Sequence, residues 1–194
     1  MTLYRQRVLE QIQQLIRPLG PLDTALDFGS GDGFFASQWQ GGDVVRRVTA
    51  VDVVERKSSL FVPQLYDGKR LPFDDSSFEL AYAIDVLHHC PDPSNALRDV
   101  SRCSRRYLLI KDHTYRSAMG KLTLGVLDEL GNRRFGIPSP YLYQRGWEWV
   151  EQIESDGWRR LSLIHPSKCH AGLLGVATNT LQFVGLWERE DAHR

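Results

Sequence analysis

The sequence lacks the features that mark several specialised classes of protein. Its three cysteines share no Cys-x-x-Cys spacing, which argues against a disulfide framework or a cysteine zinc site. Lysine plus arginine and aspartate plus glutamate number 24 each, so the charge balance argues against a nucleic-acid partner. No apolar run is long enough to span a membrane, and the N-terminal residues lack the apolar core of a secretory signal. We therefore expect one cytoplasmic domain over residues 1–194, with no membrane partner.

Two common phosphate-binding motifs are also missing from the one glycine-rich segment, residues 25–35. A dinucleotide fingerprint requires a glycine at position 34, and this chain has Phe34 there. A P-loop requires Gly-Lys followed by Ser or Thr, and no such sequence follows. These absences argue against a nicotinamide-dependent oxidoreductase and against a triphosphate site.

What the segment does contain is an apolar strand, a turn with alternate glycines and the start of a helix. The strand holds Asp27, and the turn contains Gly29, Gly31 and Gly33. Glycine permits positive φ and lets bare backbone approach a small molecule. A strand, turn and helix of this kind form a cradle for a nucleotide-type ligand, although a tight turn without a ligand has the same local sequence.

Acidic residues follow the next two predicted strands. Residues 44–53 are rich in β-branched side chains and predict a buried strand that ends near Asp52. A carboxylate about twenty residues after the glycine turn is placed to accept hydrogen bonds from both ribose hydroxyls. A short helix over 55–60 and a third strand over 61–66 lead to Asp67 and Gly68, which form a turn signal and lie where an acid could accept from an adenine amine.

The remaining segments continue the alternation of helices and strands, which predicts an α/β fold. Residues 114–145 break this alternation, and we expect them to be a lid insertion after the fifth strand. Two closing strands with no helix between them are expected to form an antiparallel pair. The elements expected outside the segments above are helices over 3–17, 34–39, 92–103 and 145–155, and strands over 78–84, 107–110, 158–164 and 181–188.

These motifs together resemble the class I S-adenosylmethionine-dependent methyltransferases, in particular the small-molecule, methyltransferase-11-like type. The resemblance rests on four segments and covers residues 22–112 well. One departure is that the family's usual Leu-Lys-Pro-Gly-Gly turn before the fifth strand is replaced here by Cys-Ser-Arg-Arg at 103–106, which bears on the subfamily. The four segments are the acidic glycine turn at 27–33, Leu-Pro-Phe at 71–73, Phe-Glu at 78–79 and the run from Asp85 to His89.

The resemblance implies a fold, a cofactor and a set of binding residues. The fold would be a Rossmann-like, seven-stranded, mostly parallel sheet with an antiparallel last strand and helices on both faces. The cofactor would be S-adenosyl-L-methionine, with its methionine portion on the glycine-turn backbone and its sulfonium near the end of the fourth strand. The implied cofactor-binding residues are Asp27, Gly29, Ser30, Gly31, Gly33, Asp52, Asp67, Gly68 and Asp85.

Methyl transfer from a sulfonium requires approach geometry, dry surroundings and in some cases a base. His88, His89, Asp112 and His113 are the candidate bases, because they follow strands whose carboxyl ends collect ligands. We favour His88 or His113 as catalytic residues, although either histidine could serve only as a loop or capping residue. No metal site is expected, because the possible ligands His88, His89, Cys90 and Asp92 crowd one loop and rarely all point inward.

The preferred function is methylation of an oxygen, nitrogen or carbon nucleophile of a small apolar or aromatic metabolite. The first alternative is a non-catalytic protein that binds S-adenosylmethionine. The second is methylation of RNA or protein, because several aromatic residues could stack nucleobases, although a neutral chain favours the apolar underside of a lid for them. Oligomeric state is left open. The aromatic residues are Tyr141, Tyr143, Trp147, Trp149 and Trp158.

Overall fold

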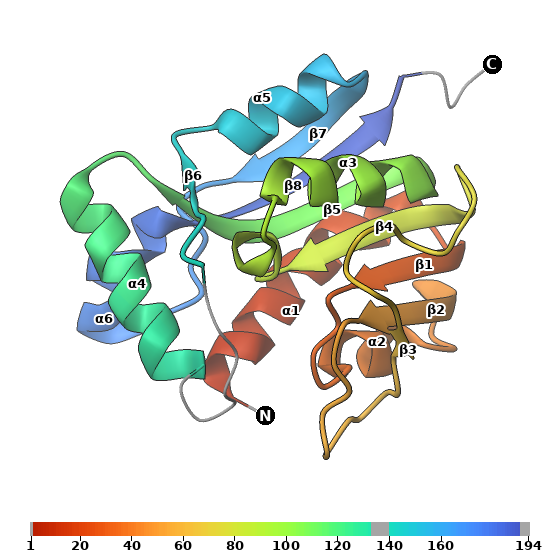
Figure 1. Ribbon diagram of the computed structural model, residues 1–194, viewed down its shortest axis with the longest axis horizontal. Helices are drawn as coiled ribbons and strands as arrows, with labels where there is room; N and C mark the ends of the chain where they lie inside the picture. Colours follow the sequence, from red (N-terminus) through yellow and green to blue (C-terminus); the bar gives the residue numbers. More distant parts are fainter. Residues whose placement is uncertain (1, 133–139, 191–194) are drawn as a thin grey trace.

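The computed structural model describes residues 2–132 and 140–190, and its centre is one mixed β-sheet (Figure 1). Seven strands follow the order β3-β2-β1-β4-β5-β8-β7, and β8 runs antiparallel to both of its neighbours. A short strand, β6, pairs in parallel with the end of β5. This topology confirms the predicted class I methyltransferase fold. The strands are β1 Leu22–Phe28, β2 Val45–Asp52, β3 Gln64–Leu65, β4 Phe78–Ile84, β5 Ser104–Tyr115, β6 Gln144–Arg145, β7 Trp158–Ile164 and β8 Gln182–Arg189.

Helices cover both faces of the sheet (Figure 1). Residues of α1 and α2 pack in one apolar cluster with the sheet, and residues of α3 and α5 pack in a second cluster. The sheet therefore has a helical layer on each side, as predicted. The helices are α1 Leu3–Ile16, α2 Phe34–Trp39, α3 Pro93–Cys103, α4 Ala118–Asn132, α5 Glu148–Ser155 and α6 Gly172–Thr178, and the short 3-10 turns are η1 Arg17–Leu19, η2 Leu87–His89 and η4 Asn179–Leu181.

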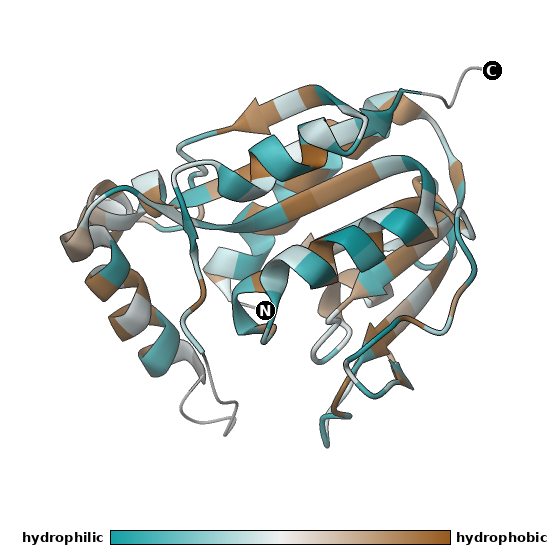
Figure 2. Ribbon diagram, turned by 45° about the horizontal axis from the view of Figure 1, so that its top comes forward, coloured by the Kyte–Doolittle hydropathy of each residue, from teal (hydrophilic) through white to brown (hydrophobic). Residues whose placement is uncertain are grey.

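The central strands are buried on both faces because their side chains alternate between the two clusters. In β4, Leu80 and Tyr82 belong to the cluster beneath α1, whereas Ala81 and Ala83 belong to the cluster beneath α3. Figure 2 shows the resulting apolar colour along the strands at the centre of the sheet. Near-continuous apolar strands are what a parallel sheet between two helical layers requires, and they direct the polar residues toward the strand ends.

The structure corrects several predicted elements. Residues 55–60 form turns and not a helix, and the third strand contains only two residues. The helix α6 lies between the two closing strands, where no helix was expected. The strand β5 continues to Tyr115 and β6 begins at Gln144, so the excursion that follows β5 spans 116–143; residues 133–139 lie outside the described ranges.

No helix in residues 2–132 or 140–190 combines the length and the apolar character needed to cross a bilayer.

Candidate functional site

The glycine turn between β1 and α2 has the left-handed backbone that its sequence predicts. Gly29, Gly31 and Gly33 have φ values of 66°, 62° and 72°, a region in which residues with a Cβ are disfavoured. Close neighbours add a second requirement for glycine. A Cβ on Gly33 would lie 2.4 Å from the carbonyl oxygen of Phe61, and one on Gly29 would lie 2.0 Å from Cγ2 of Val86. The turn thus keeps bare backbone against two other segments of the chain.

Asp52 ends β2 and holds the glycine turn in place. Its Oδ2 accepts a hydrogen bond from the backbone N–H of Gly31 at 2.7 Å, and its Oδ1 accepts one from Val53 at 2.7 Å. The parallel register of β1 and β2 places Asp27 opposite Ala50 and brings the two strand ends together. The predicted ribose carboxylate therefore lies directly beside the predicted methionine-binding turn.

Asp67 and Gly68 follow the short strand β3, next to the end of β2. A Cβ on Gly68 would lie 3.3 Å from Cγ1 of Val53, so Gly68 is adjacent to the residue that follows Asp52. Asp67 is exposed, and its Oδ1 accepts a hydrogen bond from the backbone N–H of Lys69 at 3.0 Å. The turn interpretation is confirmed by this hydrogen bond, and the carboxylate borders the strand edge at which Asp52 lies.

Two polar atoms near the glycine turn are buried without a direct hydrogen bond among the described residues, although the Tyr82 hydroxyl and the Ala36 backbone lie near the Asp27 carboxyl group. The two atoms are Oδ2 of Asp27 and Oγ of Ser30. Asp27 is only 2% exposed, and burial raises the pKa of its carboxyl group from 3.8 to about 7. A ligand with a hydrogen-bond donor or a cationic amine would satisfy such groups. This chemistry fits the amino and carboxylate ends of an amino-acid moiety.

Asp85 lies just past β4 and is bound by groups from two other elements. It has a positive φ of 53°. Its Oδ2 accepts a hydrogen bond from the hydroxyl of Tyr4 at 2.6 Å, and its Oδ1 lies 2.5 Å from Nζ of Lys111. Lys111 is fully buried and also donates to the Tyr4 hydroxyl and to Oε1 of Gln182. The Asp85 carboxylate thus joins α1 to the sheet.

A second contact joins α1 to the glycine turn. Arg5 lies 2.6 Å from Oδ2 of Asp32 in an ion pair that is partly exposed. With the contact from Tyr4 to Asp85, this places the start of α1 beside the glycine turn and the end of β4. The sequence analysis named no partners for these two residues of α1, because no local pattern identifies contacts that lie 81 and 27 residues away along the chain.

Asp112 of β5 is the centre of a buried cluster of histidines. Its Oδ1 lies 2.6 Å from Nδ1 of His88 and 3.0 Å from Nδ1 of His113. The backbone N–H groups of Leu87 and His113 also donate to this carboxylate, at 3.0 and 2.8 Å. Burial alone would raise the pKa of Asp112, but the two imidazoles hold it well below its ordinary value. The carboxylate therefore fixes the orientation of both predicted catalytic histidines.

The two histidines differ in their protonation. Burial would lower the pKa of His88, but the carboxylates of Asp112 and Asp128 raise it above its ordinary value. Burial lowers the pKa of His113, and the neighbouring His88 lowers it further, although Asp112 opposes both effects. The Nδ1 of His113 faces Asp112, so a tautomer with the proton on Nδ1 presents Nε2 as an acceptor.

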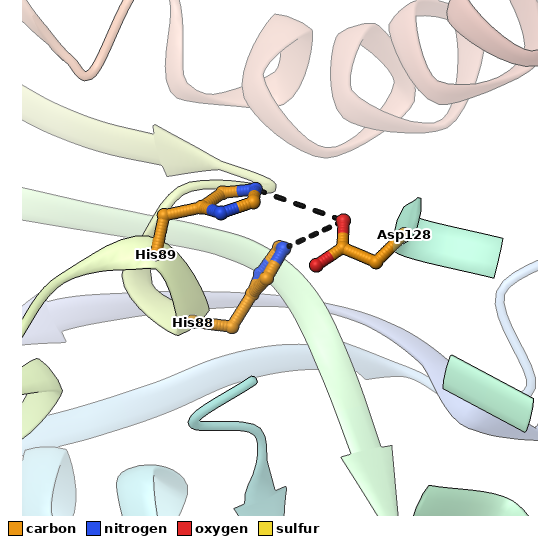
Figure 3. Close-up of side chains that lie close together, drawn as sticks. All are labelled: His88, His89 and Asp128. Carbon is orange, nitrogen blue, oxygen red and sulfur yellow. Dashed lines mark ion pairs between the residues drawn. The ribbon is translucent and has the colours of Figure 1, made fainter. Parts of the chain in front are cut away.

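Asp128 of α4 completes this cluster, and the sequence analysis did not find it. Its Oδ1 lies 3.6 Å from Nε2 of His88 and 3.7 Å from Nε2 of His89, and Figure 3 shows both rings directed at the same oxygen. The hydroxyl of Tyr143 donates to Oδ2 of Asp128 at 3.0 Å. Asp128 lies forty residues from His88 along the chain. Only its place in the leucine-rich helix that follows β5 could have drawn attention to it.

The aromatic residues considered for stacking nucleobases have different places in the structure. Trp149 and Trp158 are buried in the core, which excludes them from a nucleobase platform. Tyr143 is also buried, and its ring centre lies 5.3 Å from that of His88 and 5.8 Å from that of His113. Tyr143 therefore forms a wall of the histidine cluster, whereas Tyr141 is partly exposed.

Residues 26–107 match the methyltransferase domain family. Among curated proteins, the chain is similar to 27-O-demethylrifamycin SV methyltransferase from Amycolatopsis mediterranei (strain S699), with 29% identity over 45% of this chain and 37% of that protein. It is also similar to sarcosine/dimethylglycine N-methyltransferase from Halorhodospira halochloris, with 28% identity over 52% of this chain and 40% of that protein. The chain thus matches less than half the length of these two curated relatives.

Among solved structures, the chain resembles the N-methyltransferase NodS from Bradyrhizobium japonicum WM9. The TM-score is 0.63 at 14% identity, and the alignment covers 97% of each chain. At this identity the likeness concerns the fold, and it agrees with the strand order described above.

Proposed function

We propose, from the premise that residues 26–107 belong to the methyltransferase domain family, that this chain is a methyltransferase that takes its methyl group from S-adenosyl-L-methionine and transfers it to a small molecule. The acceptor is an oxygen, nitrogen or carbon nucleophile. The two curated relatives are named for transfer to oxygen and to nitrogen, and neither name decides the acceptor of this chain.

The observation that best supports this proposal is that bare glycine backbone and two buried polar atoms without hydrogen bonds in the described part of the chain, Oδ2 of Asp27 and Oγ of Ser30, occur together at the glycine turn. The turn backbone and Ser30 would hold the methionine portion of the donor, and the Asp27 carboxylate would accept from its ammonium group. Asp52, fixed by its hydrogen bond from Gly31, would accept from the ribose hydroxyls. The parallel strand ends and the Asp52 hydrogen bond fix the relative positions of these groups before a donor binds.

Adenine would lie between the end of β2 and the turn at Asp67 and Gly68. Asp85 would act from the opposite side of the glycine turn, where Val86 already packs against Gly29. Since the Asp85 carboxylate is held by Tyr4 and Lys111, we assign it to shaping the sulfonium end of the site and not to a direct ion pair with the donor.

His113 is the proposed base for acceptors that carry a proton. Asp112 orients its ring at Nδ1, and Nε2 would take the acceptor's proton. In the transfer, the nucleophile forms a bond to the methyl carbon while the carbon–sulfur bond breaks, and S-adenosylhomocysteine leaves with the electron pair. His88, with each ring nitrogen near a carboxylate, is better suited to positioning than to accepting a proton.

The proposal extends to the organisation of the chain. Residues 1–194 would form one methyltransferase domain, with 116–143 as a lid over the acceptor side. Tyr143 and the leucine-rich helix α4 supply apolar and aromatic surface beside the histidines, which favours an acceptor that is small and apolar or aromatic.

Isothermal titration with S-adenosylmethionine tests the donor site. Asp52→Ala should weaken binding at least tenfold, about 1.4 kcal/mol, because it removes both the ribose acceptor and the anchor of Gly31. Asp43→Ala, an exposed carboxylate that precedes β2, should bind as the unmutated protein does. If the unmutated protein shows no binding, or if Asp52→Ala leaves the affinity unchanged, the proposed site is wrong.

A second measurement separates an enzyme from a non-catalytic binder. The full chain is incubated with S-adenosylmethionine and a pool of small phenols, amines and carboxylates, and S-adenosylhomocysteine is quantified. Product above the acceptor-free control supports the methyltransferase, whereas tight donor binding without product for any acceptor favours the binder.

A further inference from the structure

We propose that His88, His89 and Asp128 bind one divalent transition-metal ion, in the first place Zn²⁺, beside the donor site. The candidate ligand atoms are Nε2 of the two histidines and Oδ1 of the aspartate. In the part of the chain that the structure describes, one atom from each of these three residues lies within 4.8 Å of the other two. This inference departs from the sequence prediction of no metal, which rested on the crowding of ligands in one loop and on the lack of a partner pair elsewhere with ligand spacing.

The spacing of these atoms is close to what a metal requires. Imidazole nitrogen and carboxylate oxygen bind zinc at about 2.0–2.2 Å, so two ligands of a tetrahedral ion lie about 3.4 Å apart. The distances from Asp128 to His88 and to His89 are 3.6 and 3.7 Å. Both rings point at the same carboxylate oxygen (Figure 3). These two distances are within a few tenths of an ångström of the metal value, and the two Nε2 atoms lie within 4.8 Å of each other.

Two of the proposed ligands are held in place by hydrogen-bonding groups behind them, as ligands in metal sites usually are. Asp112 lies 2.6 Å from Nδ1 of His88, so with an ion bound, a proton held between them would leave the Nε2 lone pair for the metal. A carboxylate behind a histidine in this way raises its basicity as a ligand. Tyr143 donates to the other oxygen of Asp128, which orients Oδ1 toward the imidazoles.

A second grouping, His88 with Asp112 and His113, also has suitable donor types and spacing. It is the weaker candidate because the Asp112 carboxylate already accepts from two backbone N–H groups and faces two imidazoles. A carboxylate offers about four lone-pair positions, so these contacts occupy Asp112 fully. Asp112 therefore belongs behind the metal ligands and not among them.

Cys90 and Asp92, the other ligands considered from the sequence, are directed elsewhere. The thiol of Cys90 contacts the backbone carbonyl of Val86, and Asp92 caps α3 through the N–H of Asn95. The adjacent-ligand argument was therefore correct for these two residues. The search for partners elsewhere relied on a pair with ligand spacing, and a single aspartate on a distant helix has no such spacing.

Charge supports a cation at this place. The Asp112 carboxylate is 0% exposed and lies 2.6 Å from the buried His88 imidazole. Buried carboxylates are costly unless a cation compensates them. A divalent ion at Nε2 of His88 would place positive charge on the far side of this ring from Asp112.

Three protein ligands leave at least one coordination position open, which is the pattern of catalytic zinc sites. This step rests on the proposed function: an oxygen or nitrogen acceptor in the open position would be polarised and its pKa lowered. His88 follows Val86, which packs against Gly29, so the ion would lie between the donor turn and the lid helix. Acceptor specificity would then favour molecules with a metal-binding heteroatom.

The test is direct metal titration of the full chain after dialysis against a chelator. Isothermal titration with Zn²⁺ should show one site, and Co²⁺ should give the visible absorption of a site with nitrogen and oxygen ligands. Asp128→Asn and His89→Gln should each weaken Zn²⁺ binding at least tenfold. Glu129→Gln is the matched control, because it removes the same charge from the exposed neighbouring position of α4 and should leave the affinity unchanged.

The variants are first compared by circular dichroism, and His89→Gln provides a second reading if Asp128→Asn folds poorly. Absence of a Zn²⁺ site in the unmutated protein overturns the inference. So does Zn²⁺ binding that survives both substitutions, which would be adventitious. Donor titration on the same samples keeps the two proposals separate: a chain that binds Zn²⁺ but not S-adenosylmethionine refutes the proposed function and supports the metal site.

Discussion

Asp27 provides a quantitative test of the donor site, because its carboxyl group is buried beside the glycine turn with one oxygen unsatisfied among the described residues. Burial raises its pKa from 3.8 to about 7 in the folded chain. Between these two values the folded state holds a proton that the unfolded state has released. Stability should therefore fall as pH rises through this window, and the loss is complete once pH exceeds the folded pKa.

The perturbation is Asp27→Asn, which keeps the shape of the side chain and stays uncharged at every pH. At about 1.36 kcal/mol for each tenfold change in proton affinity, the difference between 3.8 and about 7 corresponds to about 4 kcal/mol. About 3 kcal/mol of this falls between pH 5 and pH 8. Relative to the unmutated chain, Asp27→Asn should gain that amount of stability over the same interval.

Urea unfolding of both proteins at pH 5 and pH 8 measures this change. All other titrating groups are shared, so they cancel in the difference between the two proteins. A difference that is the same at both pH values would refute the burial argument.

Donor binding provides an independent check of the same carboxylate. If the ammonium group of S-adenosylmethionine pairs with Asp27, binding favours the carboxylate form and releases a proton near pH 6. Titrations in buffers of different ionisation enthalpy count that proton. Asp27→Asn should release none, and equal proton release by both proteins would separate Asp27 from the donor.

Two further predictions concern the framework of the site. Gly33→Ala should destabilise the chain by more than about 1–2 kcal/mol, because alanine is strained in the left-handed backbone and its Cβ would meet the Phe61 carbonyl. The control is Gly41→Ala, which has a φ of 71° and no atom within 4 Å of its Cβ position, so it should show the backbone cost alone. Equal losses of stability for the two variants in urea unfolding would refute the close-contact argument. Lys111→Met should lower the free energy of unfolding by about 3–5 kcal/mol, because it leaves the Asp85 carboxylate without the Lys111 ammonium group. Adding Asp85→Asn should recover part of that loss in the same urea assay. A double variant no more stable than Lys111→Met would contradict this account.

The placement of Asp52 beside the glycine turn, where the donor site is proposed, could be predicted because its parts are local. Gly29, Gly31 and Gly33 lie in one turn, and the strand period sets the distance along the chain to Asp52. Strand ends in a parallel sheet meet at one edge. A local sequence pattern combined with this rule therefore brings Asp52 to the turn, where it accepts the hydrogen bond from Gly31.

Contacts made by packing could not be predicted in the same way. Residues 55–60 were expected to be helical, but they form turns against the glycine loop, where the N–H of Leu60 donates to the carbonyl of Asp32 at 2.6 Å. The helix α6 was missed because its glycines disfavour helix. At Gly175 that glycine is needed, since a Cβ would lie 2.5 Å from the carbonyl oxygen of His170. In both cases the tertiary contact outweighs the local preference.

The acceptor half is assembled from two parts that reach the site by different routes. The end of β4 and β5 supply His88, His89 and Asp112 through the register of the sheet, whereas Asp128 arrives only when α4 packs beside them. Helical periodicity identifies the face of α4 but not the residue that it will meet. Because the two imidazoles and the carboxylate converge on one point, the proposed ion would join the lid helix to the sheet at the place proposed for the acceptor. Acceptor binding would thus depend on α4 docking, while donor binding depends only on the strand ends.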